Sequence, residues 1–118
     1  GNSGFYFNVT DRQQAGGSVI EIQIRDSAGA KELTAHAICG GILPGITPTA
    51  NAAKPAGEWN LMKVTSLDGV VTVTLNDVQV NQAKLTHTRL KTKPKQGFIG
   101  FQDHGIPLWL RNVRIRER

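Results

Sequence analysis

The sequence has little cysteine and no long apolar run. Its single cysteine, Cys39, excludes an internal disulfide and a zinc site built from cysteines. Because Cys39 lies in the apolar stretch AICGGIL, we expect a buried, unreactive thiol. No stretch approaches the ~20 apolar residues that a membrane-spanning helix needs, so we expect no membrane span.

Aromatic residues are also few, at 6% of the 118 residues, whereas the net charge is +5. Basic side chains gather in two runs, within residues 89–95 and 111–118. A surface for nucleic acid would interleave such charges with aromatic side chains. The first run holds no aromatic residue and only Trp109 flanks the second. We therefore interpret both runs as solvated segments and expect no nucleic-acid partner.

Helical patterns are nearly absent, because apolar residues do not recur at the i, i+3, i+4, i+7 spacing of an amphipathic helix. Polar and apolar residues instead alternate in short runs between turn residues, which is typical of strands. The expected strands cover residues 3–10, 18–26, 58–67, 69–77, 78–80, 97–102 and 107–116. We predict an all-β fold, a sandwich or barrel, in a single domain over residues 1–118.

Turn and loop signals separate these strands. Asp68-Gly69 is a hairpin dipeptide, and Asn76-Asp77 marks a second turn. Residues 40–57 carry four Gly and three Pro without a clean period. This composition predicts a long ordered loop, and loops of that length are often functional.

The stretch EIQIRD is the first candidate site. Strand alternation turns its isoleucines into the core and places Glu21, Gln23 and Arg25 together on the opposite face. Asp26 has the other parity and joins that face only if a bulge shifts it. The pattern fits a solvated strand of mixed charge, and it equally fits the concave polar sheet face on which sandwich proteins bind sugars.

The stretch GFIGFQDHG is the second candidate site. Gln102 and His104 share a strand face with Gly100, whereas Asp103 points the other way. Gly100 leaves space where a ligand can approach closely, and histidine is the usual proton carrier near neutral pH. A turn histidine at a strand end is the plainer alternative.

Metal binding has only weak support in the sequence. Glu21, Asp26 and His104 are a possible set of ligands for a divalent metal, but no spacing requires it. We therefore expect no cofactor, with a divalent metal as the open alternative. His36 and His87 have no convergent neighbours in the sequence, so we expect surface or structural roles for them.

The segments GNSGFYF, EIQIRD, KPAGEWN, VTVTLNDVQV and GFIGFQDHGIPLWLRNVRIRE follow one another along the chain. In this combination the chain resembles the bacterial 3-keto-disaccharide (3-keto-glycoside) hydrolase family. The family's Gly-x-Ile-Gly-Leu-Gln-x-His-Gly run is matched from Gly97 to Gly105, with Phe101 in place of the leucine. The resemblance implies a two-sheet β-sandwich, a concanavalin-A-like jelly roll related in architecture to laminarinases and legume lectins.

The resemblance also has implications for the whole protein. It implies that residues 1–118 are the C-terminal two-thirds of a longer family domain and lack its N-terminal strands. A partner chain or a homo-oligomer would then complete the sheet. It further implies a carbohydrate ligand and a bacterial protein that is secreted to the periplasm or the extracellular space.

The activity that the resemblance implies is cleavage of 3-keto-glycosides by acid–base chemistry of the elimination type. Glu21 and His104 are the expected catalytic pair, with base and acid in either order. Substrate contacts are expected from Asn2, Gln23, Asp26, Gln102, Asp103, Trp109 and Arg111. A non-catalytic carbohydrate-binding β-sandwich is the alternative function.

Three further expectations concern a glycanase signature, Arg111 and Trp59. The laminarinase-type signature Glu-x-Asp-x-x-Glu has Gln23 and Asp26 at its second and third positions here, which disfavours a conventional retaining mechanism with two carboxylates. We expect Arg111 to pair with Asp103 or Glu21, or to touch the ligand. We expect Trp59 to pack in the core.

Overall fold

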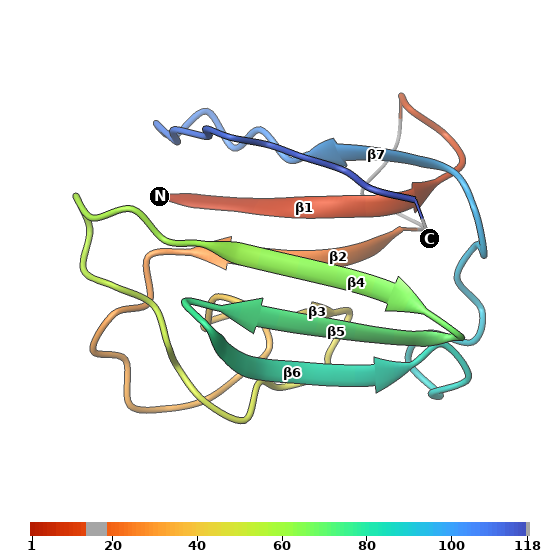
Figure 1. Ribbon diagram of the computed structural model, residues 1–118, viewed down its shortest axis with the longest axis horizontal. Coiled ribbons are helices and arrows are strands. Elements are labelled where there is room, and N and C mark those ends of the chain that lie inside the picture. Colours follow the sequence, from red (N-terminus) through yellow and green to blue (C-terminus); the bar gives the residue numbers. More distant parts are fainter. Residues whose placement is uncertain (14–18, 118) are drawn as a thin grey trace.

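The computed structural model describes residues 1–13 and 19–117, which form seven β-strands and no helix (Figure 1). The strands are β1 (Asn2–Val9), β2 (Ile20–Arg25), β3 (Ile42–Leu43), β4 (Met62–Leu67), β5 (Val70–Leu75), β6 (Val78–Lys84) and β7 (Phe98–Phe101). Two parts of the sequence predictions lie outside the described residues. They are residue 18, where a strand was expected to start, and Arg118, the last residue of the second basic run. No helix of the described part is long and apolar enough to cross a membrane.

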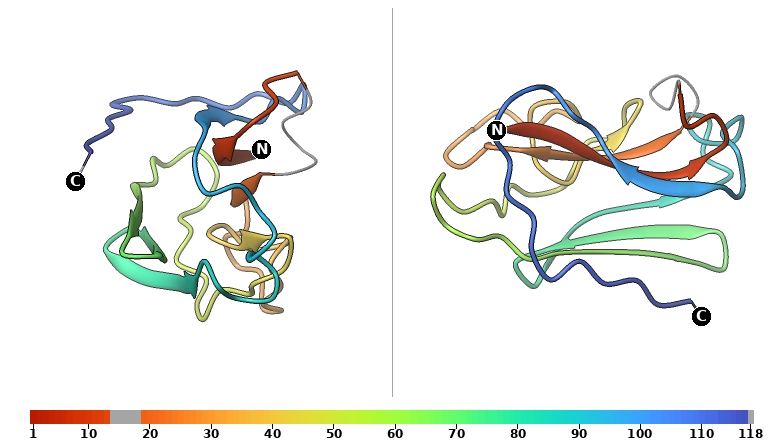
Figure 2. Two further views of the ribbon diagram at one scale, coloured as in Figure 1. Left: turned by 90° about the vertical axis from the view of Figure 1, so that its right-hand side faces the viewer. Right: turned by 90° about the horizontal axis from the view of Figure 1, so that it is seen from above.

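Two antiparallel sheets pack face to face. The larger sheet has the strand order β3-β2-β1-β7, and the smaller has the order β4-β5-β6. Two side views show the sheets as separate layers (Figure 2). The predicted all-β, two-sheet β-sandwich is therefore confirmed, whereas the specific likeness to concanavalin A stays a prediction.

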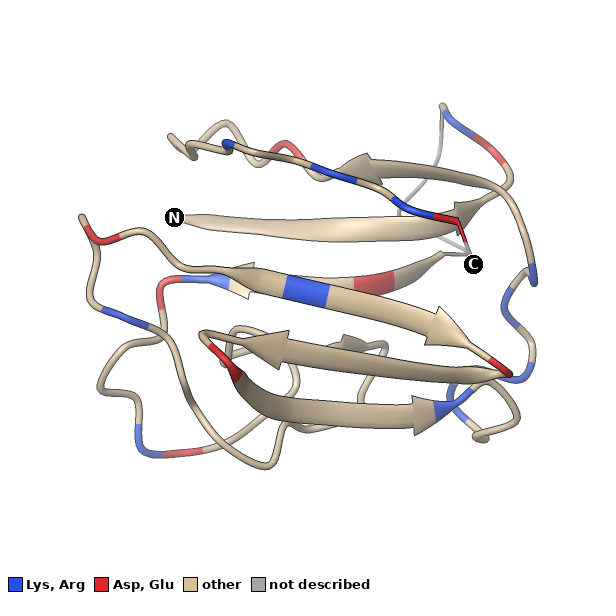
Figure 3. Cartoon of the chain, in the orientation of Figure 1, with Lys and Arg blue, Asp and Glu red and all other residues tan. Residues whose placement is uncertain are grey.

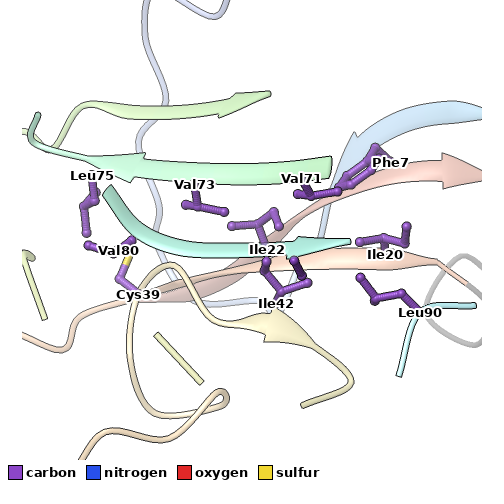
Figure 4. Close-up of a cluster of buried hydrophobic side chains, with 11 residues drawn as sticks. Phe7, Ile20, Ile22, Cys39, Ile42, Val71, Val73, Leu75, Val80 and Leu90 are labelled. Carbon is purple, nitrogen blue, oxygen red and sulfur yellow. The ribbon is translucent and has the colours of Figure 1, made fainter. Parts of the chain in front are cut away.

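The core lies between the layers and follows the predicted alternation. Ile20 and Ile22 of β2 and Val71 and Val73 of β5 are fully buried in one cluster (Figure 4). Each such side chain contributes about 1.5–3 kcal/mol when buried, so this cluster fixes which face of each strand points inward. Cys39 joins the cluster as a free thiol, as expected, and its burial raises the pKa of the thiol.

Both predicted turns are confirmed as tight hairpins. The φ angles are 51° and 75° at Asp68 and Gly69, and 51° and 67° at Asn76 and Asp77. Two successive residues in the left-handed region make the turn whose twist matches that of the flanking strands. Asn, Asp and Gly tolerate this region best, which is why these dipeptides gave a reliable signal.

Two predicted strand boundaries were wrong. Strand β4 starts at Met62 rather than at residue 58, because the Leu61 N–H donates to the side chain of Asn76 instead of a strand partner. Strand β6 continues past Val80 to Lys84, because its polar positions also pair with β5. The short strand β3 lies within residues 40–57, which were expected to form only a loop.

A bulge in β1 breaks the simple alternation expected of a strand, and it changes the face to which Val9 points. The pairing of β1 with β7 shifts register between Tyr6 and Val9, and Asn8 has a φ of 58°. The extra residue turns Val9 away from the Phe7 side, so that it packs with Tyr6 and Val19 in a second buried cluster. The outer face of the larger sheet thereby gains a small apolar ridge.

The C-terminal stretch is the largest correction to the fold. Residues 107–116 were expected to form a strand, but within the described part of the chain they pair with no strand. The segment crosses from one layer to the other and stays on the outside (Figure 2). Its alternating apolar residues are exposed, with Val113 at 61% and Ile115 at 77%. Alternation alone cannot make a strand without an edge to pair with.

Charged side chains lie mainly outside the strands. Lysine and arginine gather in the β6–β7 connection and in the C-terminal segment, as expected for solvated runs (Figure 3). Most of the strand surface carries no charge, so the acidic residue of β2, Glu21, stands out on the larger sheet.

Candidate active site

Three neighbouring strands place polar residues and glycines in rows across the outer face of the larger sheet. In the register of β1 and β2, Tyr6 lies opposite Glu21 and Gly4 lies opposite Gln23. In the register of β1 and β7, Gly100 lies opposite Tyr6. Residues directly opposite one another share a face. Glu21, Tyr6 and Gly100 therefore form one row on the face directed away from the core.

Gly4 leaves room for the Glu21 carboxyl group. A β-carbon built on Gly4 would overlap Glu21 Oε1, so the Glu21 side chain lies over the backbone of β1. The Gly4 carbonyl accepts a hydrogen bond of 2.9 Å from the Gln102 N–H, and the Gln102 carbonyl accepts one of 2.6 Å from Ser3 Oγ. These bonds anchor the end of β7 beside Glu21, at the start of the segment that carries His104.

Opposing effects act on the Glu21 carboxyl group. Its partial burial raises the pKa of Glu21, and positive charge on His104 and His36 lowers it. Such charge effects fall off with distance, so both histidines lie near enough to Glu21 to act on the charge of its carboxyl group. Burial and the negative charge of Glu21 raise the pKa of Tyr6. The catalytic roles themselves stay predictions.

Glu21 borders an open hollow of about 180 Å³. The lining residues are Val19, Glu21, His36, Leu43, Pro44 and Lys93. His36 was expected to have a surface or structural role, and Lys93 was treated only as part of a solvated run, but the structure places both beside Glu21. No local pattern links either residue to Glu21, because only the packing of two loops against the sheet brings them there. Lysine and histidine supply positive charge beside the carboxyl group.

The family model described as the 3-keto-alpha-glucoside-1,2-lyase-like domain matches residues 1–116 of this chain. The chain belongs to this family. The resemblance inferred from its motifs is therefore confirmed, and the lyase-like domain covers almost the whole chain.

Two known proteins are similar to this lyase-like domain. A 3-keto-disaccharide hydrolase of Bacteroides thetaiotaomicron is 27% identical over 98% of this chain and 53% of its own length. A crystal structure of a protein described as a glycosyl hydrolase, from Parabacteroides distasonis, is 26% identical with a TM-score of 0.77. That match covers 89% of this chain and 64% of the solved one. The chain thus spans about half the length of the curated relative.

The other polar residues of β2 in this lyase-like domain hold the next loop. Gln23 is 4% exposed, and its Nε2 donates to the carbonyl of His36, as does Arg25 Nη1 at 3.2 Å. The register of β1 and β2 runs without a bulge as far as Arg25, so Asp26 is not turned onto the Glu21 face. Gln23 thus helps to place His36 beside Glu21, while substrate contacts by Gln23 and Asp26 stay predictions.

Asp103 and Asn2 are two further predicted substrate contacts. They differ in whether a side-chain oxygen already accepts a hydrogen bond. Asp103 Oδ1 accepts a hydrogen bond of 2.7 Å from the Gly105 N–H, which closes an exposed turn. Asn2 Oδ1, on the same face as Gly4, is buried with no hydrogen-bond partner among the described residues. A buried acceptor without a donor is costly, so the Asn2 side chain gains if it turns to meet a donor.

The predicted aromatic and arginine contacts lie elsewhere. The Arg111 guanidinium lies over the Trp59 ring, 3.9 Å from its centre, so the expected pairing with Asp103 or Glu21 was wrong. Trp59 is 46% exposed rather than part of the core. Trp109 is 74% exposed on the C-terminal segment and does not line the hollow beside Glu21.

The possible metal set does not assemble. Within residues 1–13 and 19–117, no group of three or more His, Cys, Asp and Glu side chains is close enough to hold a metal ion. Asp26 is not turned onto the Glu21 face, so the possible set with Glu21 and His104 does not form.

Proposed function

We propose that this lyase-like domain carries the catalytic site of an enzyme that cleaves 3-keto-glycosides, including 3-keto-disaccharides, by elimination. One observation carries the proposal: a half-buried carboxyl group, Glu21, has a raised pKa beside two histidines and borders a hollow on the outer sheet face. A raised pKa makes a carboxylate a stronger base. The family and the name of the Bacteroides relative supply the substrate class.

The ketone determines the chemistry. A carbonyl at C3 acidifies the proton at C2, and the glycosidic oxygen at C1 is then in position to leave. The Glu21 carboxylate takes the C2 proton, the electron pair forms the C1=C2 bond, and the C1–O bond breaks with its electrons going to the leaving oxygen. Protonated His104 gives that oxygen a proton. Addition of water across C1=C2 returns the 3-keto sugar, so the net reaction is hydrolysis.

Negative charge develops on the C3 oxygen when the C2 proton leaves. Positive groups and hydrogen-bond donors aimed at such an oxygen usually give the largest stabilisation of a transition state. Lys93 and His36 line the hollow with Glu21 and supply that charge. Asn2 and Gln102, on neighbouring strand ends of the same face, are the further contacts to the sugar hydroxyl groups.

Two substitutions test the proposal. Glu21→Gln and His104→Ala are each expected to slow cleavage of a 3-keto-glucoside by about 10²–10⁴-fold, since each removes a proton-transfer group. The matched controls are Glu58→Gln and His87→Ala, at exposed positions outside the site, and both should retain activity. Full activity in both single variants, Glu21→Gln and His104→Ala, would overturn the assignment.

The pH profile provides an independent readout. A base works only when ionised, so the rate rises as the pH passes through the pKa of Glu21. Because burial raises that pKa, the acid limb of kcat/KM should lie above the ~4.3 of an ordinary glutamate. An acid limb at or below that value would contradict Glu21 as the base.

A non-catalytic carbohydrate-binding module is the second candidate function. The exposed Trp109 ring, at 74%, and the open hollow favour it, since sugar-binding surfaces present aromatic faces. A binding module would retain 3-keto-glucosides and plain glucosides equally and cleave neither. Soaking both ligands with the protein and following product release separates the two candidates.

A further inference from the structure

A second hollow lies along β7, the edge strand of the larger sheet, on the far side of Tyr6 from Glu21. Its volume is about 380 Å³. The lining residues are Tyr6, Val9, Arg12, Phe98, Ile99, Gly100 and Phe101. None of these residues has a role in the proposed elimination.

Strand register fixes its position relative to Glu21. Tyr6 lies opposite Glu21 on one side and opposite Gly100 on the other. Neighbouring strands are about 4.8 Å apart, so Glu21 and Gly100 are about 10 Å apart across the sheet. That spacing is about the length of two linked six-membered rings. A sugar beside Glu21 therefore has its leaving group over Gly100.

The floor of this hollow is open. A β-carbon built on Gly100 would meet no atom within 4 Å, and the backbone of Gly100 is not in the left-handed region. No conformational demand therefore explains glycine at this position, and close approach of a ligand does.

The walls are apolar, with one cation. Phe98 is 55% exposed, and the Arg12 guanidinium lies 4.8 Å from the centre of its ring. Among the lining residues that the structure describes, Arg12 carries the only full charge, and the other groups offer apolar surface with one tyrosine. A second sugar needs several hydrogen bonds to its hydroxyl groups, whereas a flat aromatic ring needs apolar and aromatic contact.

We propose that this hollow binds the leaving group of the substrate and selects an aromatic alcohol, that is, an aryl 3-keto-glycoside. This inference rests on the proposed function and names the substrate class of that same site. The aromatic ring packs on Phe98 over Gly100, and Arg12 lies beside it. When the C1–O bond breaks, its electron pair goes to the aryl oxygen, the positive charge of Arg12 favours the negative charge that develops there, and His104 then gives that oxygen its proton.

Competing substrates test the selection. The 3-keto derivative of 4-nitrophenyl glucoside is compared with a 3-keto-disaccharide, in the wild type and in Gly100→Val. The valine takes the space in which the aryl ring packs on Phe98, whereas a sugar leaving group has no aromatic stacking contact to lose there. KM for the aryl substrate should therefore rise at least tenfold more than KM for the disaccharide. Ser66→Val, at an exposed strand position of the other sheet, is the control. Equal changes for both substrates would overturn the proposal.

Binding of 4-nitrophenol gives a readout that does not need turnover. The wild type should bind it, measured by calorimetry, and Gly100→Val should not; Gly100→Ala should bind it more weakly than the wild type. If the wild type cleaves neither keto substrate but this binding pattern holds, the proposed function fails and the aromatic subsite stands. If wild type and Gly100→Val bind 4-nitrophenol equally, or neither binds it, the subsite is overturned.

Discussion

At the scale of single residues, the site depends on one contact that the sequence hides. Glu21 extends over the neighbouring strand because Gly4 has no side chain there. The sequence placed Glu21 on a polar face by alternation, but it gave no reason to link Gly4 with it. Only the antiparallel register, which sets Gly4 opposite Gln23, brings the glycine under the carboxyl group.

We therefore expect Gly4→Ala to act on catalysis through Glu21. The added methyl group would overlap the carboxyl group and displace it, and a misplacement of about 1 Å can cost ~10²-fold in rate. The measurement is kcat/KM on a 3-keto-glucoside, with the circular dichroism spectrum as a check of folding. Gly45→Ala is the control, since a β-carbon there meets nothing nearer than 3.8 Å. Wild-type kcat/KM in Gly4→Ala would show that Glu21 does not need its observed position.

At the scale of elements, the two hairpin turns of the smaller sheet could be predicted from the sequence. The conformation of the stretch before β4 could not. Asn76 starts the β5–β6 turn, and its side chain also fixes the stretch before β4. Its Oδ1 accepts from the Leu61 N–H at 2.9 Å, and its Nδ2 donates to the Ala52 carbonyl and to Asn60 Oδ1, each at 2.8 Å. One turn residue therefore sets where a distant strand begins.

Substitutions of Asn76 separate the contribution of its left-handed backbone from that of its side-chain hydrogen bonds. Asn76→Gly keeps the left-handed backbone but loses the side-chain bonds, which should lower the free energy of unfolding by about 1–3 kcal/mol. Asn76→Ala also strains the backbone, and about 1–2 kcal/mol more should be lost. Urea denaturation measures both, with the exposed Gln79→Ala as the control. Equal stability of the Gly and Ala variants would refute the backbone contribution.

At the scale of the whole molecule, the open edge beside β7 is the main feature. We define it as the large exposed apolar side chains of the C-terminal segment that follows β7. Its members are Ile106, Leu108, Trp109, Leu110, Val113 and Ile115, exposed by 36–77%. Exposed apolar surface of this extent marks a site of association. It supports the expectation, still a prediction, that further polypeptide completes the sheet.

We expect residues 1–118 to self-associate through the open edge as concentration rises. The double variant Val113→Lys and Ile115→Lys should stay monomeric in sedimentation velocity runs, because like charges repel and the apolar contact is lost. Its stability should change by only about 0.5 kcal/mol, since both side chains are exposed. The control Thr86→Lys and Thr88→Lys adds the same charge on an exposed loop. Equal association of the two double variants would rule out the open edge.

The sequence by itself determined the fold class, the inward face of most strands, both hairpin turns and the polar face of β2. These are local properties, because alternation and left-handed turn residues act within a few positions of the chain. The motif resemblance added the family, and with it the expected pairing of Glu21 with His104.

Tertiary structure alone decided what surrounds Glu21: the space over Gly4, the approach of His36 and Lys93, and the second hollow at Gly100. It also decided that the last alternating stretch has no strand to pair with. Such features arise from strand register and loop packing between residues far apart in the chain, and no local pattern encodes them.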